Sequence, residues 1–371
     1  MQQKQPTRKY ARRRKLALIL PGHNEELIIG ATIDSAVAAG LSISDIYVVD
    51  DASTDKTRRI AVSKLSRKNV LTVKRSGKAR AVSKAIKRFK IVQRYTWVHV
   101  ADADSIFCPE YFRIYRRHLN MRQYSAAVGF VQSMRGNWIA IYRSFSYTYG
   151  QHIFRRIQSW FGMIAVLPGP VTCFKCDIIP QLNFQSGSLT EDFDLTLQIH
   201  RKHLGRIRFI PEAVNFTQDP RTVHDFYAQT LRWQRGFFQG LRTYHIGLRP
   251  QLVDVGVAYQ MSESTIYLFQ LLILTPLLLM TPNTHGVLFL VLVGDYIAVS
   301  CLAIFSALAA KRPSILLALA YFYVLRFVEL AGFVQSFIEI FILRKFRTTT
   351  LGWRTEGRRY AVHSQDIQNL Q

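Results

Sequence analysis

Four short polar motifs follow one another in a fixed order along this chain, and an apolar C-terminal third comes after them. One pair of aspartates would mean little, because the solvated end of a strand often carries such a pair. Four such motifs, spaced along a plausible α/β domain, are hard to produce by accident. The motifs are Asp50-Asp51, Asp102-Ala103-Asp104, Thr190-Glu191-Asp192 and Gln229-Thr230-Leu231-Arg232-Trp233.

The first half of the chain alternates short apolar runs with segments of helical spacing. Such an alternation predicts an α/β fold with a mostly parallel sheet and right-handed crossovers. A Ser-Thr-Asp sequence at 53–55 is a helix start signal. The predicted strands are 16–20, 46–49, 70–73 and 96–100. The predicted helices are 25–39, a helix that starts after 53–55 and ends at 65, and 78–89.

The acidic motifs fall where predicted strands end. Segments 21–26, 50–51 and 102–105 each follow directly after a predicted strand. Ligands of parallel sheets bind outside the carboxyl ends of the strands. The topology alone therefore predicts that these three segments converge on one site.

The C-terminal third contains three long apolar runs, at 266–280, 286–310 and 314–343. The first two are about long enough to cross a bilayer, at roughly 20 residues per helix. The short link between them predicts a helical hairpin with both ends on one side. Lys311 and Arg312 mark that side as cytoplasmic, because basic residues accumulate there.

The third run is ambiguous because it carries Arg326, Glu329 and Glu339. A simple crossing would also place the basic residues after 343 outside, against the positive-inside tendency. The internal charges suggest a face buried in protein, a cavity wall or an interfacial helix. We expect a span or a re-entrant element that lines a path.

The formal net charge of +25 indicates a polyanionic partner, either nucleic acid or an anionic membrane leaflet. The apolar C-terminal third favours the membrane. The first fifteen residues are polar and basic, without the apolar core of a secretory signal. They are either a solvated tail or a segment that rests on anionic lipid headgroups.

Asp102 and Asp104 have the spacing of a metal site. In an extended segment, residues i and i+2 point to the same side. Two carboxylates supply the hard oxygen ligands that Mg²⁺ or Mn²⁺ prefers. The alternative is a turn in which both side chains bond to the backbone.

The ordered motifs make the region from about 16 to 240 resemble the membrane-bound, inverting family 2 glycosyltransferases. The hyaluronan, chitin and poly-N-acetylglucosamine synthases are the most similar group. Besides the four motifs, the matching segments are 21–26, 48–55, Gly77-Lys78-Ala79 and Pro168-Gly169-Pro170. Ser83 and the Lys175-Cys176 pair depart from the pattern of this group. The resemblance implies a GT-A fold, a Rossmann-like mixed sheet, followed by C-terminal transmembrane helices.

For the donor side, the resemblance implies a UDP-sugar and a divalent ion. Asp51, with Asp50 beside it, would hold the uracil or ribose, and Lys78 would lie near the base and diphosphate. Asp102 and Asp104 would bind the diphosphate and its Mg²⁺ or Mn²⁺. Arg232 can contact the diphosphate with two hydrogen bonds.

For the acceptor side, the resemblance makes Asp192 the general base that removes the proton of the attacking hydroxyl. Glu191 would lie near the acceptor, with Gln229 bonded to donor or acceptor. Trp233 offers a flat apolar face for a sugar ring. Gln229, Arg232 and Trp233 share a helix face at i, i+3 and i+4. A structural alternative for Asp192 is a favourable charge at the N-terminus of a helix that Thr190 caps.

The sequence leaves three functions open. The first is a synthase that extends a β-linked polysaccharide with N-acetylglucosamine, with an oligomer or a partner subunit completing any channel. The second adds one sugar to a lipid acceptor. The third, a basic nucleic-acid-binding or membrane scaffold protein, is disfavoured because the carboxylates would repel phosphates. The expected regions are a basic tail 1–15, a cytosolic catalytic domain 16–248, an interfacial and membrane part 249–343, and a basic tail 344–371.

Overall fold

The computed structural model describes residues 14–119, 123–248, 250–345 and 360–361, and most of the two basic tails lies outside these residues. In the described part, eight strands form one mixed sheet in the order β3-β2-β1-β4-β7-β6-β8-β5. The strands are β1 Arg14–Gly22, β2 Ile46–Asp51, β3 Val70–Val73, β4 Tyr95–Val100, β5 Ile106–Phe107, β6 Tyr124–Ser133, β7 Thr172–Lys175 and β8 Arg206–Thr217.

The N-terminal half of the sheet is parallel, as the alternating pattern predicts. Strands β1, β2, β3 and β4 are neighbours and run in the same direction. The expectation of a mostly parallel sheet is too simple for the second half. Strand β7 enters between β4 and β6 antiparallel to both, and β5 pairs antiparallel with β8. The sheet is therefore mixed, which is the form that the family resemblance implies.

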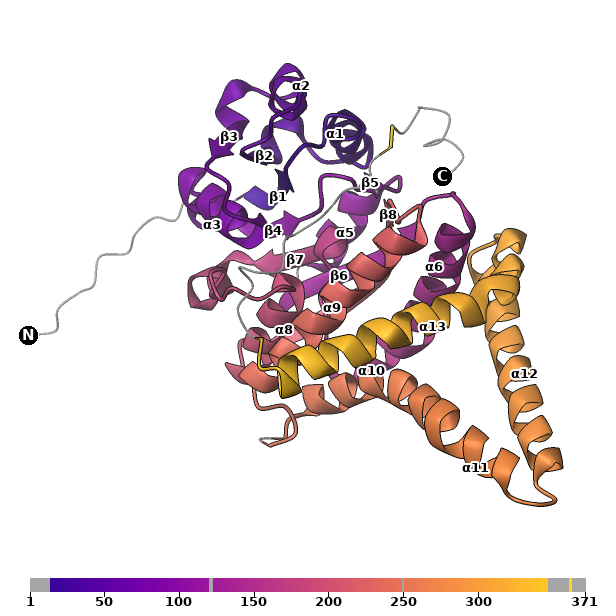
Figure 1. Cartoon of the computed structure of the whole chain (residues 1–371). Coiled ribbons are helices and arrows are strands. Elements are labelled where there is room, and N and C mark those ends of the chain that lie inside the picture. The colour runs from indigo at the N-terminus through magenta and orange to yellow at the C-terminus, as the bar shows by residue number, and fades with distance from the viewer. Residues whose placement is uncertain (1–13, 120–122, 249, 346–359, 362–371) are drawn as a thin grey trace, which may run out of the picture.

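Helices cover both faces of the sheet (Figure 1). One face packs against α1 Ile29–Ala38, α2 Thr57–Lys64 and α5 Tyr111–His118. The other packs against α3 Lys78–Arg88 and α8 Glu191–Arg201. This burial of apolar side chains on two faces stabilises the sheet and holds the ends of its strands in place.

The predicted helix 25–39 begins later than expected, at Ile29. Its first residues form a turn instead, and their backbone amides bond to another segment. The Glu25 amide donates to Thr57 Oγ1 at 2.6 Å, and the Glu26 amide donates to Asp55 Oδ2 at 3.1 Å. These bonds connect the segment after β1 to the segment after β2.

A long helix in three parts follows β6 and leads towards the C-terminal helices. Its parts are α6 Trp138–Tyr149, the π-helical turn η3 Gly150–Arg155 and α7 Arg156–Phe161. Asn137 caps the N-terminus, where its Oδ1 accepts from the amides of Ile139 and Ala140. The buried side of α6 packs against α12 and α13, so this helix joins the sheet domain to the apolar helices.

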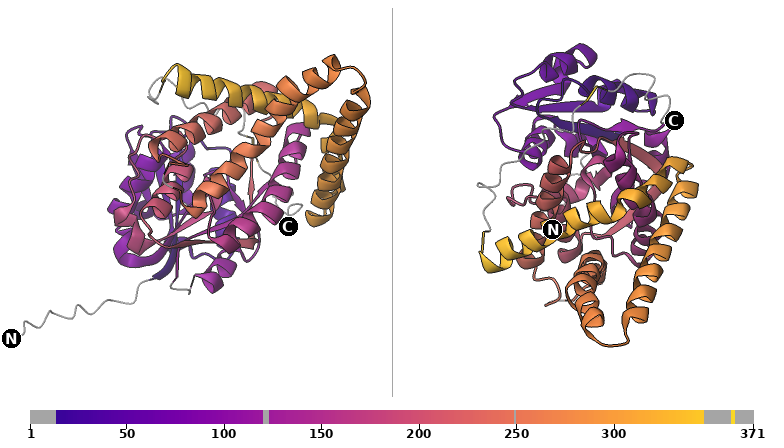
Figure 2. Two further views of the ribbon diagram at one scale, coloured as in Figure 1. Left: turned by 90° about the horizontal axis from the view of Figure 1, so that it is seen from below. Right: turned by 45° about the vertical axis from the view of Figure 1, so that its right-hand side comes forward.

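Among the residues that the structure describes, three helical stretches are long and apolar enough to cross a membrane, judged by length and composition: Leu252–Met280, His285–Ala309 and Pro313–Ile342. The first two form the predicted hairpin and extend away from the sheet (Figure 2). They comprise α10 Leu252–Phe269, η6 Gln270–Leu274, α11 Thr275–Met280 and α12 His285–Ala309.

The third stretch has a face buried in protein, which was one of the alternatives for its internal charges. It consists of η7 Pro313–Leu317, α13 Ala318–Phe337 and η8 Ile338–Ile342. Helix α13 lies along α9 Val223–Thr243 (Figure 1). Glu339 pairs with Arg235 of α9 at 2.5 Å.

Candidate functional site

A cavity of about 540 Å³ opens at the carboxyl ends of the parallel strands. The predicted convergence of segments 21–26, 50–51 and 102–105 is found here, since each contributes residues to the wall. Of the predicted site residues, only Asp50 does not line the cavity. The others are Asp51, Lys78, Asp102, Asp104, Glu191, Asp192, Gln229, Arg232 and Trp233.

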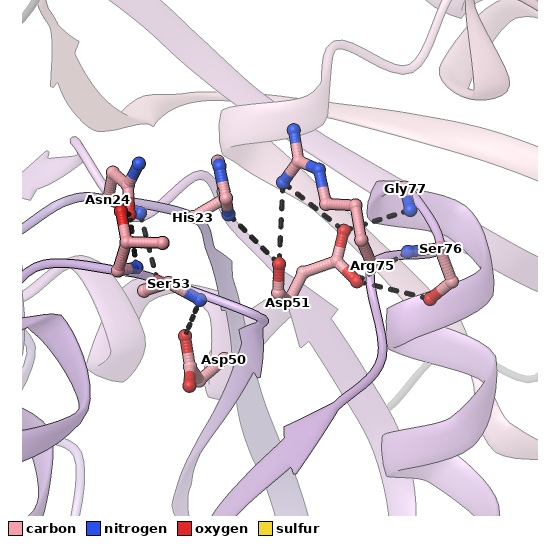
Figure 3. Close-up of polar contacts among 9 residues, drawn as sticks. His23, Asn24, Asp50, Asp51, Ser53, Arg75, Ser76 and Gly77 are labelled. Carbon is pink, nitrogen blue, oxygen red and sulfur yellow. Dashed lines mark hydrogen bonds and ion pairs between the residues drawn. The ribbon is translucent and has the colours of Figure 1, made fainter.

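Asp51 organises the loop between β3 and α3 (Figure 3). Its Oδ1 accepts from the Ser76 amide at 2.8 Å, and its Oδ2 accepts from the Gly77 amide at 2.8 Å. Arg75 Nη1 lies 3.4 Å from the same carboxylate. Gly77 has φ 82°, in the left-handed region that favours glycine. The loop thus presents a cation and a helix N-terminus to the cavity.

The Asp50 side chain points away from that of Asp51 and has a different structural role (Figure 3). Its side chain is buried, and its Oδ1 accepts from the Ser53 amide at 3.0 Å. Ala52 between these residues has φ 59°, so the backbone reverses there. The Asp50 carboxylate therefore stabilises the loop that follows β2. The geometry does not support a direct contact between this carboxylate and a ligand.

Lys78 connects two of the motifs across the cavity. Its Nζ lies 2.5 Å from Asp102 Oδ1 and 3.0 Å from Glu191 Oε1. Burial lowers the pKa of Lys78, but the charges of Asp102 and Glu191 outweigh burial and hold it above its usual value. Gly169 gives the ammonium group room, because a Cβ at that position would collide with Nζ.

Asp192 lies in the first turn of α8 and has an unusual acidity. Burial, with the nearby charge of Glu191, raises the pKa of its carboxyl to about 6, although Lys78 and the Phe193 amide oppose the shift. The Phe193 amide donates to Asp192 Oδ1 at 2.8 Å. A carboxylate whose pKa lies near the working pH can accept a proton from a substrate hydroxyl.

The predicted capping of α8 by Thr190 is wrong. Thr190 sits at the N-cap position, but its side chain makes no capping bond and its Oγ1 has no hydrogen-bond partner among the described residues. The Thr190 side chain packs against helix α9 instead, so closely that a Cβ at Gly236 would collide with it. The Asp192 carboxylate accepts from an amide of this turn instead.

The close approach at Gly236 carries a testable consequence. We expect Gly236→Ala to separate α9 from α8 and to destabilise the fold by about 2 kcal/mol, because overpacking forces such shifts. Catalytic activity should fall along with the melting temperature. Gly286→Ala is the matched control, since a Cβ there meets nothing within 4 Å. Equal melting temperatures of the two variants would contradict the role of this contact.

The predicted face of α9 is present in the structure. Gln229, Arg232 and Trp233 all line the cavity, and Arg232 Nη1 donates to the Leu189 carbonyl oxygen at 3.4 Å. This bond links α9 to the segment that precedes Asp192. The motif that begins at 229 and the motif that ends at 192 therefore form one wall of the cavity.

Arg143 of α6 is a site residue that the sequence reasoning missed. Its guanidinium lies 4.6 Å from the centroid of the Trp233 ring, and its Nη2 donates to Gln229 Oε1 at 3.2 Å. Its Nη1 lies 3.8 Å from Glu329 of α13. Arg143 covers one face of the indole, so a ligand could stack only on the other. The sequence signal that could have identified Arg143 is a single cation within an apolar helical segment.

We expect Arg143→Lys to weaken acceptor use about 10-fold, because lysine loses the planar stacking and the bond to Gln229. The Michaelis constant of the acceptor should rise, while that of the donor changes little. Arg156→Lys, at an exposed position of the same long helix, is the control. A similar change in donor and acceptor constants would argue for general damage instead.

The cavity continues from Glu191 and Asp192 to the apolar helices. Glu263 of α10 and Arg326 and Glu329 of α13 line its far end. Arg326 Nη1 lies 3.2 Å from a carboxylate oxygen of each glutamate, and the Tyr142 hydroxyl donates to Glu329 at 2.7 Å. Two of the charges that made the third apolar run ambiguous, Arg326 and Glu329, thus belong to the wall of this cavity, whereas the third, Glu339, pairs with Arg235.

Arg155 is a second residue that the sequence reasoning missed. It lines the cavity, and its Nη1 donates to the Val166 carbonyl oxygen at 2.7 Å. Burial lowers the pKa of its guanidinium to about 10, although the charge of Asp192 opposes this shift. A cation held near Asp192 favours the negative form of that carboxylate.

The residues at the cavity fit a hard divalent cation. Asp102 and Asp104 offer oxygen donors on the wall, both half-buried. Within the described ranges, no group of three or more His, Cys, Asp and Glu residues forms a metal cage. Mg²⁺ is commonly held by one or two carboxylates, with substrate phosphates as further ligands, and this donor set suits that arrangement.

The comparison with family models gives one broad match. A model described as "Glycosyltransferase like family 2" matches residues 13–236. That range covers more than half of the chain and contains every predicted site residue.

Two curated relatives match a similar length of chain. A probable glycosyltransferase, YdaM of Bacillus subtilis (strain 168), is 28% identical over 238 residues, which are 60% of this chain and 55% of the relative. A poly-beta-1,6-N-acetyl-D-glucosamine synthase of Staphylococcus aureus (strain COL) is 23% identical over 239 residues, which are 60% and 54% of the two chains. The match thus spans about half the length of these relatives.

Among solved structures, the mannosyltransferase PcManGT from Pyrobaculum calidifontis, in complex with GDP-Man and Mn²⁺, has a similar fold. The TM-score is 0.53 at 17% identity, and the match covers 88% of each chain. The expected fold class, a GT-A α/β domain followed by apolar C-terminal helices, is confirmed.

Proposed function

This chain belongs to the glycosyltransferase-like family 2, and on that premise we propose that it transfers a sugar from a UDP-sugar to a hydroxyl acceptor with inversion of configuration. The observation that carries the proposal is the meeting of Lys78, Asp102, Glu191 and Asp192 at one cavity, with the Asp192 carboxyl poised at a pKa of about 6. The preferred donor is UDP-N-acetylglucosamine, which makes the activity that of an N-acetylglucosaminyltransferase within the hexosyltransferases. The preferred product is a β-linked polysaccharide.

The donor occupies the end of the cavity at the parallel strands. The loop that Asp51 organises receives the uridine, and Arg75 and Lys78 face the diphosphate. Asp104 and Asp102 would hold Mg²⁺ or Mn²⁺, which neutralises the charge that develops on the leaving diphosphate. Arg232 supplies a further cation to the same diphosphate.

Transfer itself needs one proton acceptor and one nucleophile. The acceptor hydroxyl gives its proton to the Asp192 carboxylate as its oxygen attacks the anomeric carbon. The bond between the anomeric carbon and the diphosphate oxygen breaks, and the nucleoside diphosphate leaves with the electron pair. Attack from the face opposite the leaving group converts an α-linked donor into a β-linked product.

The acceptor lies on the side of Trp233, Gln229 and Glu191. The free face of the indole stacks on a sugar ring, the Gln229 amide donates to or accepts from sugar hydroxyl groups, and the Glu191 carboxylate accepts from them. Beyond them the wall combines aromatic residues with polar ones, including Tyr149, Tyr259 and Gln260. Such a mixed wall suits further sugar units, which supports the polysaccharide as acceptor.

A single addition to a lipid acceptor is the second candidate, and a separate groove favours it. An apolar groove of about 610 Å³ runs between the α10–η6 and α13–η8 segments. Leu268, Leu272, Phe327 and Leu330 are among its lining residues, and Glu339 lies on its wall. A hydrocarbon chain of an acceptor lipid would fit these side chains.

We also propose that the hairpin of the first two apolar stretches crosses the membrane, that the third stretch remains beside α9, and that the catalytic domain is cytoplasmic. The length of the first two stretches suits a bilayer, and Lys311 and Arg312 follow the hairpin on the same side as the sheet domain. The excess of basic residues then faces anionic lipid headgroups rather than nucleic acid. A homo-oligomer or a partner subunit would complete any path for a polymer.

The test is product sizing with the full chain in membranes. Membranes that contain the protein are incubated with Mg²⁺ or Mn²⁺ and a panel of radiolabelled donors, which includes UDP-N-acetylglucosamine, UDP-glucose and GDP-mannose. Long polymer from a UDP-sugar supports the synthase. One sugar on an extractable lipid supports the second candidate. Metal-independent, salt-sensitive binding of nucleic acid without any sugar transfer would overturn both.

A further inference from the structure

The ion-pair cluster at the far end of the cavity leaves one edge of a guanidinium group without an acceptor. Arg326 contacts Glu263 and Glu329 through its Nη1, and its side chain is 7% exposed. Its Nε and Nη2 are buried and have no hydrogen-bond partner among the residues that the structure describes. Buried donors of a charged side chain are seldom left in this state, because their desolvation is costly. An oxyanion from a ligand would supply the missing acceptors.

This edge has the geometry that binds an oxyanion through two parallel hydrogen bonds. Nε and Nη2 lie on one side of the planar guanidinium group, and such a fork matches a carboxylate or a phosphate. Arg235 uses the same two nitrogens for Glu339, with Nε and Nη2 at 2.5 Å and 2.7 Å from the two carboxylate oxygens. Within the described part of the chain, the equivalent edge of Arg326 remains available to a ligand.

Arg143 supplies a second cation at the same end of the cavity. Its Nη1 lies 3.8 Å from Glu329, which also contacts Arg326, so the two guanidinium groups share one carboxylate. Its Nε is likewise buried without a hydrogen-bond partner in the described ranges. Glu263 is 44% exposed and can turn away from Arg326 when a ligand enters. Two cations then face the ligand beside one carboxylate, which favours an anion.

The apolar groove adjoins this cluster. Arg326 directly precedes Phe327 of the groove wall, and Leu330 follows one helical turn later. On the opposite wall, Glu263 precedes Leu268 along α10. The Glu263–Arg326 ion pair therefore joins the two helices that form the walls of the groove. A molecule with an anionic head and a hydrocarbon chain can place its head at Arg326 and its chain in the groove.

We infer that the acceptor is a lipid-linked sugar phosphate, whose phosphate group binds Arg326 and Arg143 and whose hydrocarbon chain lies in the groove. Phosphate oxygens fill the fork of Arg326, and the apolar side chains of the groove remove the chain from water. The Arg143 guanidinium also lies 4.6 Å from the centroid of the Trp233 ring, on which the acceptor sugar stacks. The sugar unit thus extends from the phosphate to the reacting hydroxyl group at Asp192.

The inference rests on the proposed sugar transfer and names the acceptor class of its second candidate. A lipid-linked primer of a polysaccharide would meet the same residues. The site at Arg326 recognises the phosphate, and the groove recognises the chain, so each part of the acceptor has its own binding surface. Removal of either part should therefore weaken binding independently.

The test compares two probes that differ only in the head group. Hexadecyl phosphate and hexadecanol are titrated onto the full chain in a non-ionic detergent, without a nucleotide sugar, and inorganic phosphate is the probe that lacks the chain. We expect the wild-type chain to bind hexadecyl phosphate at least tenfold more tightly than either hexadecanol or inorganic phosphate.

Variants assign this preference to the two surfaces. Arg326→Gln should reduce the preference for hexadecyl phosphate over hexadecanol to less than twofold. Arg326→Lys keeps the charge but loses the fork, so part of the preference should remain. Leu272→Gln, at an exposed position of the groove, should weaken both lipid probes equally. Arg58→Gln, on the exposed surface of α2, is the matched control and should change neither affinity.

Equal wild-type affinities for hexadecyl phosphate and hexadecanol would overturn the inference, as would a tenfold preference that survives in Arg326→Gln. Inorganic phosphate that binds as tightly as hexadecyl phosphate would indicate a site for the free ion and would overturn it as well. Melting temperatures report the folding of each variant, and Arg326→Lys provides the comparison if Arg326→Gln does not fold. Sugar transfer is measured separately, so its absence beside an intact phosphate preference contradicts the proposed function alone.

Discussion

Asp192→Asn should slow sugar transfer by about 10³-fold, because an amide cannot accept the proton of the attacking hydroxyl. Donor binding should remain, since the residues assigned to the nucleotide are unchanged. The melting temperature should not fall, because burial already disfavours the charged carboxylate, as its raised pKa indicates. Single-turnover transfer and calorimetric binding of the UDP-sugar with metal measure the two effects in one preparation.

Asp177→Asn is the control for this variant, because Asp177 is an exposed acid outside the cavity wall. It should transfer sugar at the wild-type rate. Rapid turnover by Asp192→Asn would show that another group takes the proton. Loss of donor binding in the same variant would place Asp192 on the donor side instead.

Lys78→Met should reduce transfer by about 10²-fold, the scale of losing one group that stabilises developing charge. Donor binding should weaken as well, since Asp102 and Glu191 would then face the diphosphate without the ammonium between them. The cation of Lys78 lowers the pKa of Asp192. Its removal should therefore move the acid limb of the rate profile to a pH above about 6.

Lys84→Met is the matched control, because Lys84 is exposed on the same helix α3. It should leave the rate and the pH profile unchanged. An unmoved acid limb in Lys78→Met would contradict the coupling between the lysine and Asp192. Equal losses in both variants would point to the net charge of the helix rather than to the contact with Asp102.

The N-terminal part of the site could be predicted because it depends on local pattern and topology. Apolar runs of four or five residues identify β2, β3 and β4, and the strand ends bring Asp51 and Asp102 to one edge. The antiparallel entry of β7 carries no such local signal. It depends on pairing with β4 across about 75 residues of chain, and sequence alternation does not report that pairing.

The residues that sequence reasoning missed act through tertiary contacts. Arg143 belongs to the site because it contacts Trp233 and Glu329, which lie far away in sequence. Asp50 looked equivalent to Asp51, but both lie in β2, where successive side chains point to opposite faces of the sheet. Thr190 has the right type for a cap, but its side chain makes no capping bond and packs against Gly236 of α9 instead.

The most direct test of the account is the pH dependence of single-turnover transfer by the wild-type chain, with saturating UDP-sugar and metal. The account predicts a rate that falls tenfold per pH unit below an inflection near pH 6, because Asp192 must be deprotonated to accept the proton. Donor binding, measured in parallel, should stay constant through that inflection. A rate that is flat from pH 8 to pH 5 would contradict the assignment of Asp192 as the base.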